Sequence, residues 1–284
     1  MIDLHSHTNH SDGSLAPPEL VAAAVQTGLE ALAITDHDTF AGHDLAVPHA
    51  AKAGLDLVCG IELSTKYGRK SVHLLAYFLQ GGPTDDFRAW ITGLQTGRHL
   101  RNQQLVDLLL SKGFEITQEE VYRRGGNLPG RPHFAAILVE KGYVPTVQKA
   151  FDDYLDESAS CYVQRDEPAF AESVERIAAA GGLSSLPHPG RVSKQPLVLE
   201  EIVHDMQKLG LRGIEVYHSD HSEQDVECYG ALAQRLSLAV TGGSDFHGST
   251  KPGVELGTGI QGKLHVPREV LVRLRDLSND LSKD

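Results

Sequence analysis

Residues 1–14 of the chain read MIDLHSHTNHSDGS. A short, mostly apolar run is followed at once by His5 and His7, and Asp12 comes shortly after. If this run is extended, His5 and His7 point to the same side, because side chains alternate along a strand. Two imidazoles so placed can bind one metal ion, since histidine is the commonest metal ligand in proteins. The stretch therefore predicts a first strand that ends in a metal site.

The rest of the chain alternates short apolar runs with alanine- and leucine-rich stretches of helical spacing. Most neighbouring runs begin roughly 25–30 residues apart, which is the size of one strand–helix unit. This alternation predicts an α/β domain with parallel strands and helical crossovers. The predicted strands are residues 2–5, 29–35, 57–63, 71–78, 182–186, 213–217 and 238–241, and helices are predicted at 17–27, 170–180, 197–209 and 223–236.

One gap between predicted strands, from residue 78 to residue 182, is much longer than the others. Its helical spacing predicts four helices, at 85–112, 118–124, 132–141 and 146–155. We interpret residues 101–165 as a small all-helical insert that caps the α/β domain. Residues 1–100 and 166–284 would then form that domain together.

Every predicted strand delivers an imidazole or a carboxylate at or near the same end. In a barrel of parallel strands the carboxyl ends meet on one face, so these side chains would converge on one pocket. A set without thiolates suits Mn²⁺, Zn²⁺ or Fe²⁺ better than a structural zinc site. There are too many candidates for one ion, and they suit two or three, with Glu62 able to bridge. The candidates are His5, His7, Asp12, His37, Glu62, His73, His188, Asp245 and His247.

Charge narrows the class of partner. The net charge of −12 argues against a global electrostatic grip on long nucleic acid. Three divalent ions beside three carboxylates would still leave a local surplus of positive charge, which attracts an anion such as phosphate. The three cysteines are far apart and predict neither a disulfide framework nor a metal site. With no long apolar run and no secretory leader, we expect a cytoplasmic protein without a membrane or an obligate protein partner.

Six motifs carry a family resemblance. They are DLHSHTNHSDG at 3–13, AITDHDT at 33–39, GIELS at 60–64, SVHLLAY at 71–77, LPHPGR at 186–191 and GSDFHG at 243–248. In this order they resemble the PHP family, the polymerase and histidinol phosphatase group, from residue 2 to about residue 248. The insert, which carries GRPHFA at 130–135, resembles the subgroup that hydrolyses nucleoside 3′,5′-bisphosphates. Some relatives in that subgroup also trim short 5′-phosphorylated RNA.

The resemblance implies a distorted (β/α)7 barrel, similar to a TIM barrel, with a trinuclear metal centre. Three Mn²⁺ ions are expected, with Zn²⁺ or Fe²⁺ as alternatives. By motif, one metal takes His5, His7, Glu62 and Asp245, a second takes Glu62, His73 and His188, and the third takes Asp12, His37 and His247. Asp36 and Asp38 are expected to orient these ligands by hydrogen bonds rather than to bind metal.

Five further residues are candidates for contacts with substrate. Arg131 precedes a proline at a predicted helix start, where free N–H groups can meet an anion, and it could hold a phosphate in bidentate fashion beside His133. His218 could contact phosphate or protonate the leaving oxygen. Arg191 or Lys194 could contact a second phosphate. For each of these, an ordinary solvated or capping side chain is the alternative. Catalytic roles are expected for His218, Arg131 and Asp245.

The resulting hypothesis is a metal-dependent phosphatase that acts on a small nucleotide. A hydroxide that bridges the metals would attack the 3′-phosphate of a nucleoside 3′,5′-bisphosphate, and the 5′-phosphate would serve as a remote handle. The first alternative is a 5′–3′ exonuclease on short 5′-phosphorylated RNA or DNA. Histidinol phosphatase activity is a second alternative. A regulatory PHP module without catalysis is a third, which the complete ligand set disfavours.

Overall fold

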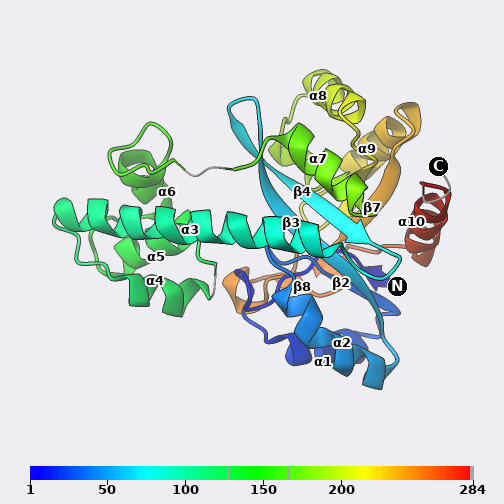
Figure 1. Cartoon of the computed structure of the whole chain (residues 1–284), viewed down its shortest axis with the longest axis horizontal. Coiled ribbons are helices and arrows are strands. Elements are labelled where there is room, and N and C mark those ends of the chain that lie inside the picture. Colours follow the sequence, from blue (N-terminus) through cyan, green and yellow to red (C-terminus); the bar gives the residue numbers. More distant parts are fainter. Residues whose placement is uncertain (127, 165–166, 282–284) are drawn as a thin grey trace.

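The computed structural model describes residues 1–126, 128–164 and 167–281 of the chain. Its centre is one seven-stranded sheet in which the strands follow in chain order (Figure 1). The sheet curls until β1 meets β7, where the Leu4 N–H donates to the Gly242 carbonyl at 3.1 Å and the Asp245 N–H donates to the His5 carbonyl at 2.8 Å. The predicted distorted seven-stranded barrel is therefore confirmed. Its strands are β1 (Ile2–Asp3), β2 (Ala31–Ile34), β3 (Asp56–Tyr67), β4 (Lys70–Phe78), β5 (Leu183–Leu186), β6 (Gly213–His218) and β7 (Ala239–Gly243).

The expectation that all the strands are parallel is wrong at β4, which pairs antiparallel with both β3 and β5. A two-residue turn at Gly68 and Arg69 joins β3 to β4, with Gly68 in the left-handed region at a φ of 61°. The physical reason lies in the spacing, since a crossover between parallel strands needs about a dozen residues and residues 64–70 are too few. The reversal brings His73, near the start of β4, beside Ser64 near the end of β3.

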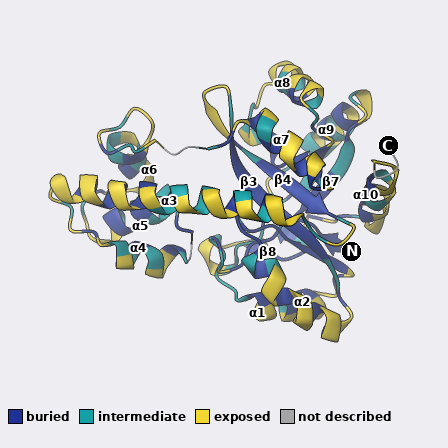
Figure 2. Cartoon of the chain, viewed as in Figure 1, coloured by how far each residue is buried: buried dark blue, intermediate teal, exposed yellow. Residues whose placement is uncertain are grey.

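Helices cover the outside of the barrel, and their buried faces follow the apolar spacing of the sequence (Figure 2). Helix α1, for example, begins with two prolines, ends at Gly28 with a φ of 75°, and packs Leu20, Val21 and Ala24 against β2. The four helices predicted for the barrel are present within two residues of their expected bounds, and α2 and α10 add to them. The barrel helices are α1 (Pro17–Thr27), α2 (Ala41–Ala53), α7 (Phe170–Ala179), α8 (Pro196–Lys208), α9 (Glu223–Arg235) and α10 (Arg268–Leu281).

The segment between β4 and α7 is helical in its described residues, as the spacing predicts. Its elements are α3 (Asp85–Ser111), α4 (Gln118–Gly125), α5 (Arg131–Glu140), α6 (Val147–Ala150) and a π-helical turn (Phe151–Leu155). Helix α3 starts beside the barrel and reaches far out from it (Figure 1). Phe87 and Ile91 belong to the barrel core, whereas Leu105 and Leu109 belong to the separate core of the insert. The predicted boundary at residues 100 and 101 therefore falls inside one continuous helix. The predicted boundary at 165 and 166 lies outside the described residues.

Short elements complete the face that carries the loops after the strands. Two 3-10 turns lie there, η2 (Pro189–Arg191) after β5 and η3 (Gly248–Thr250) after β7. A small antiparallel hairpin follows, made of β8 (Val254–Glu255) and β9 (Gly259–Ile260).

Across the described residues, none of the helices combines the length and the apolar character that a bilayer crossing requires.

Candidate metal centre

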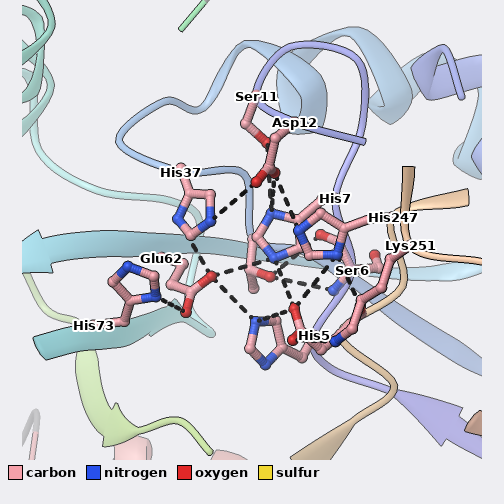
Figure 3. A network of polar contacts seen from close by, with 12 residues as sticks. His5, Ser6, His7, Ser11, Asp12, His37, Glu62, His73, His247 and Lys251 are labelled. Carbon is pink, nitrogen blue, oxygen red and sulfur yellow. Dashed lines mark hydrogen bonds and ion pairs between the residues drawn. The ribbon is translucent and has the colours of Figure 1, made fainter. Parts of the chain in front are cut away.

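All nine side chains proposed as metal ligands converge at one end of the barrel, around Glu62, and Figure 3 labels seven of them, all but His188 and Asp245. One carboxylate oxygen of Glu62, Oε2, lies 3.3 Å from His5 Nε2 and 3.2 Å from His7 Nε2. The other, Oε1, lies 2.9 Å from His73 Nδ1 and 3.0 Å from His188 Nε2. Glu62 thus stands between two sets of imidazoles, as a bridging ligand would.

Two further carboxylates complete the cluster. Asp245 Oδ1 lies 3.4 Å from both His5 Nε2 and His7 Nε2. Asp12 lies on the other side of His7, where its Oδ1 is 3.1 Å from His247 Nε2 and its Oδ2 is 3.6 Å from His37 Nε2. The structure therefore forms several groups whose possible ligand atoms lie within 4.8 Å of one another, among them His5, His7, Glu62 and Asp245, then His7, Asp12, His37 and His247, and then His37, Glu62 and His73.

Two imidazoles, His5 and His188, are within hydrogen-bond geometry of Glu62, but three other contacts fit metal ions better than hydrogen bonds. Among the residues that the structure describes, His7 Nε2, His37 Nδ1 and His73 Nδ1 are buried without a hydrogen-bond partner, although each lies within 3.3 Å of a Glu62 oxygen. Ligands at about 2.1 Å from one ion and 90–110° apart are themselves about 3.0–3.4 Å apart. These buried nitrogens have lone pairs that no donor satisfies, and their spacing from the Glu62 oxygens is that of atoms bound to one ion. A divalent ion would therefore fit between them. The mixed imidazole and carboxylate donors suit Mn²⁺, Zn²⁺ or Fe²⁺.

Electrostatics in the cluster favour a bound cation. Burial alone would raise the pKa values of Glu62 and Asp245, but the surrounding imidazoles hold both well below the usual range. The same carboxylates outweigh the burial of His7 and raise its pKa to about 10. Burial, aided by neighbouring positive charge, lowers the pKa of His37 to about 3 and that of His188 to about 4. The ionised carboxylates and the neutral His37 and His188 are in the forms that bind metal, whereas a metal ion at His7 would have to displace its proton.

Glu215, on β6, is a fully buried residue of the centre that the sequence analysis missed. Its Oε1 accepts a hydrogen bond from His5 Nδ1 at 2.9 Å, and its Oε2 accepts one from the His188 N–H at 2.7 Å. Burial would raise the pKa of Glu215, but His5 and His218 lower it to about 2. The carboxylate therefore holds the proton of His5 on Nδ1 and leaves Nε2 free to face the cluster. The available signal was an acidic residue within the apolar run of β6.

Two aspartates hold the loops that carry ligands. Asp36 accepts hydrogen bonds from the N–H and hydroxyl of Thr8 and from the hydroxyl of Ser11, and so fixes the turn before Asp12. Asp38 accepts from the N–H and hydroxyl of Ser64 and from the guanidinium of Arg98, which ties this loop to α3. In the structure both act through loops rather than on the ligand side chains themselves.

Strained backbone conformations occur in three loops that carry candidate ligands, those that follow β2, β5 and β7. Asp38, His188 and Asp245 have φ values of 52°, 33° and 55°, in the left-handed region that side-chain-bearing residues rarely adopt. Such conformations persist where the surroundings impose them, and they cluster at functional sites.

Above the cluster lies a cavity of about 400 Å³, and most of the predicted substrate contacts line it. Arg131 and His133 enter it from the start of α5, and Arg131 lies 5.7 Å from the centre of the Tyr162 ring. His133 Nδ1 lies 3.0 Å from the Gly130 nitrogen and 3.3 Å from the Gly130 carbonyl oxygen, so the ring is held against the start of α5. Lys194 instead lines a neighbouring cavity of about 520 Å³.

Arg191 and His218 lie beside the metal candidates rather than at a distance from them. Arg191 Nη2 is 3.1 Å and His218 Nε2 is 3.3 Å from the same oxygen of Asp245, Oδ2. His218 Nδ1 accepts a hydrogen bond from the Asp220 N–H at 3.0 Å. With Nδ1 as the acceptor, a neutral His218 ring has its proton on Nε2, facing Asp245, and His218 also forms a group of possible metal ligands with His5 and Glu215.

Comparison with known proteins agrees with this geometry. The PHP domain profile matches residues 3–159. A 3′,5′-nucleoside bisphosphate phosphatase from Chromobacterium violaceum is 32% identical over 90% of this chain and 90% of its own length. A 5′-3′ exoribonuclease from Escherichia coli is 32% identical over 90% of this chain and 87% of its own. The structure of a proposed metal-dependent phosphoesterase from Bifidobacterium adolescentis superimposes with a TM-score of 0.80 at 32% identity, covering 96% of this chain and 94% of that one. The chain therefore belongs to the PHP domain family.

Proposed function

We propose that this protein is a metal-dependent phosphoesterase that removes the 3′-phosphate from nucleoside 3′,5′-bisphosphates. The observation that carries the proposal is the cluster around Glu62, with its buried unsatisfied nitrogens, at the floor of a cavity with cationic walls. Arginines from both the barrel and the insert, Arg191 and Arg131, line this cavity. Such a site suits a small polyanion.

We propose Mn²⁺ as the resident metal, held in three positions by the nine candidate ligands. When bound, divalent ions acidify water for attack at neutral pH and neutralise charge on phosphoryl oxygens. The residues of the chain would bind and orient the substrate. His218, with Nε2–H beside Asp245, would donate a hydrogen bond from Nε2 to a phosphoryl oxygen of the substrate. Arg131, which lines the cavity from the insert, would hold the second phosphate and so orient the first.

The apolar part of the cavity wall favours a nucleoside over a smaller alcohol. Leu128, Phe151, Tyr162 and Val163, all from the insert, line the cavity opposite a largely polar floor. Aromatic and aliphatic side chains of this kind can contact the face of a base. Histidinol phosphate would leave much of this wall without a partner.

The name of the Chromobacterium violaceum relative agrees with this choice of substrate, and the match extends over most of both chains. The relative from Escherichia coli supports the broader class, phosphate ester hydrolysis, through a different substrate.

The test is a phosphate-release screen with protein purified and reconstituted with Mn²⁺. The substrates are adenosine 3′,5′-bisphosphate, adenosine 3′-monophosphate, histidinol phosphate and a short 5′-phosphorylated RNA. We expect fastest release of inorganic phosphate from the bisphosphate, with adenosine 5′-monophosphate as the other product. Fastest release from histidinol phosphate would contradict the substrate proposal. Protein that binds no metal and releases no phosphate would support a regulatory module instead.

A specific observation keeps the exonuclease as the second candidate. A cavity of about 620 Å³ adjoins the first and shares His73, Arg131 and Arg191 with it. Arg69 and Lys70, at the tip of the β3–β4 hairpin, line its outer part. The remainder of a short oligonucleotide could follow these cationic side chains, beside Asp156 and Glu157 in the same cavity, while its 5′ end lies at the metals. Stepwise release of mononucleotides from 5′-phosphorylated RNA, faster than phosphate release from the bisphosphate, would favour this activity.

A further inference from the structure

Lys251 lies among the polar side chains of the centre, although none of the six sequence motifs contains it (Figure 3). Its Nζ is 2.8 Å from Asp245 Oδ2, the oxygen that Arg191 and His218 also approach. The side chain is 28% exposed and lines the same cavity as Arg131 and Arg191. It is therefore accessible to a molecule in the cavity while it remains anchored at the metal candidates.

The backbone before Lys251 is fixed to the centre. The hydroxyl oxygen of Thr250 lies 2.8 Å from the carbonyl oxygens of both Asp12 and His247, which share its one hydrogen. The Ser249 N–H donates to the hydroxyl of Ser14 at 2.9 Å. The turn η3 thus holds the start of the lysine side chain against two loops that carry candidate ligands. This distinguishes Lys251 from a solvated surface lysine, whose position nothing determines.

The two oxygens of Asp245 face different groups. Oδ1 faces the imidazoles of His5 and His7, at 3.4 Å from each, which is the side where a metal would bind. Oδ2 receives three donors, two of them cationic. Arg191 has a second carboxylate partner, Asp220, at 2.8 Å. An ammonium group has three N–H bonds. Lys251 uses one of them for the hydrogen bond to Asp245 and can donate hydrogen bonds from the others to a further oxygen.

We propose that Lys251 binds the phosphoryl group that is cleaved, by donating hydrogen bonds from Nζ to one of its oxygens. This inference rests on the proposed function, and it assigns the lysine to the transferred phosphate rather than to the 5′-phosphate handle. Donors fixed where negative charge develops stabilise the transition state, and their effect is largest at a site screened from water. Lys251 acts only as a hydrogen-bond donor and forms no covalent bond.

The proposal predicts different substrate dependence for variants of Lys251 and of Arg131. Loss of Lys251 affects every substrate that places a phosphate on the metals, whereas loss of Arg131 affects substrates with a second phosphate. Lys251→Met should therefore lower kcat/KM by a similar factor for a nucleoside 3′,5′-bisphosphate and for a nucleoside 3′-monophosphate. Lys251→Arg, which keeps the charge, should restore part of the loss.

The decisive test uses inorganic phosphate as the probe, with metal-loaded full-length protein and binding followed by calorimetry. We expect Lys251→Met to weaken phosphate binding about ten-fold or more, while metal content per chain stays at the wild-type value. Lys263→Met, a matched change at an exposed lysine beyond β9, should bind phosphate like the wild type.

Unchanged phosphate binding in Lys251→Met would overturn the inference. Loss of metal from this variant would also overturn it, because it would place Lys251 in the support of the ions. A failure of the proposed function is visible separately, as wild-type protein that binds phosphate but releases none from the bisphosphate.

Discussion

At the scale of single residues, the buried carboxylate of Glu215 decides which nitrogen of His5 faces the metal candidates. It accepts from His5 Nδ1 with one oxygen and from the His188 N–H with the other. Two candidate ligands from different strands are thereby fixed by one side chain. Partners of this kind set the tautomer and orientation of a ligating histidine.

Glu215→Gln tests this role. The amide keeps the shape of the side chain, but it offers one acceptor and one donor where two acceptors are needed, so its NH2 group would face an N–H. We expect the affinity for Mn²⁺ to fall roughly 10- to 100-fold, measured by metal titration of the chelator-treated protein. Glu227→Gln, at an exposed position on α9, is the matched control and should not change the affinity. Equal affinities in the two variants would contradict the assigned role.

Arg131→Met tests the proposed contact between Arg131 and the 5′-phosphate of the substrate. Arg131 lines the cavity from the insert and lies over Tyr162, away from the Asp245 donors. We expect kcat/KM for a nucleoside 3′,5′-bisphosphate to fall about ten-fold or more, because a charged hydrogen bond to phosphate is lost. The value for the nucleoside 3′-monophosphate should change little. A similar fall for both substrates would place Arg131 at the cleaved phosphate instead.

The sequence could predict the convergence of the nine candidates because each lies in a short motif at or near a strand end. Glu215 and Lys251 were missed because neither lies in such a motif, and the acidic residue within the apolar run of β6 was the one local signal for Glu215. Glu215 lies within β6 beside Ile214 and Val216, so its inward direction depends on the neighbouring strand. Lys251 follows a 3-10 turn, and its approach to Asp245 depends on how that turn is tied to residues 12–14. Long-range contacts of this kind are not visible in local spacing.

At the scale of elements, the contact between β1 and β7 closes the barrel and joins the first and last motifs. Gly243 makes the approach possible, because a Cβ there would lie 2.3 Å from the His5 nitrogen and 2.4 Å from the His5 Cβ. Gly243 belongs to the GSDFHG motif, next to Ser244 and Asp245. A glycine is required at this position by space rather than by a positive φ.

Gly243→Ala should therefore destabilise the protein by about 1–3 kcal/mol, as overpacking of a close contact does, and should also lower metal content by displacing His5. Urea unfolding and metal analysis measure the two effects. Gly93→Ala is the control, since it lies exposed in α3 with no atom within 4 Å of the added carbon. There the change should stabilise by about 0.5–1 kcal/mol. Equal stabilities for the two variants would contradict the account of closure.

The direction of β4 shows why element order is easier to predict than strand direction. Both β3 and β4 were predicted from their apolar runs, and His73 was placed among the ligands. The regular βα alternation elsewhere suggested parallel strands, but the turn at Gly68 and Arg69 makes a hairpin. His73 still reaches Glu62 because it lies near the start of a reversed strand, at the same end of the barrel as the carboxyl ends of the others.

At the scale of the whole molecule, the site is shared between barrel and insert. The barrel supplies the metal candidates and the donors on Asp245, and the insert supplies Arg131 and the apolar wall. The sequence predicted both parts and their helical or α/β character. It could not predict that α3 runs through both, because a continuous helix shows no break in spacing where its buried partners change.

The shifted pKa values in the centre should make the metal-free protein less stable both at acid and at alkaline pH. The pKa values of His37 and His188 are lowered to about 3 and about 4, so below pH 6.5 the unfolded chain takes up protons that the folded chain does not. The free energy of unfolding then falls as the pH falls. The pKa of His7 is raised to about 10, so its contribution is complete below pH 6.5 and is lost as the pH rises towards 10.

We therefore expect urea unfolding with excess chelator to show a higher midpoint at pH 6.5 than at pH 5 or pH 9. The lowered pKa values of Glu62 and Asp245 add a further loss of stability only below about pH 4.5, where the unfolded chain protonates these carboxylates. A midpoint that rises steadily from pH 5 to pH 9 would contradict these pKa directions.

The central claim is that the cluster around Glu62 holds three divalent ions. The most direct measurement is the number of metal ions per chain, from equilibrium dialysis against Mn²⁺ followed by elemental analysis, for the wild type and for His7→Ala. The account predicts a plateau at three ions for the wild type and a lower plateau for His7→Ala, because His7 belongs to two of the ligand groups. A wild-type plateau at one ion, or the same number of ions in both proteins, would contradict it.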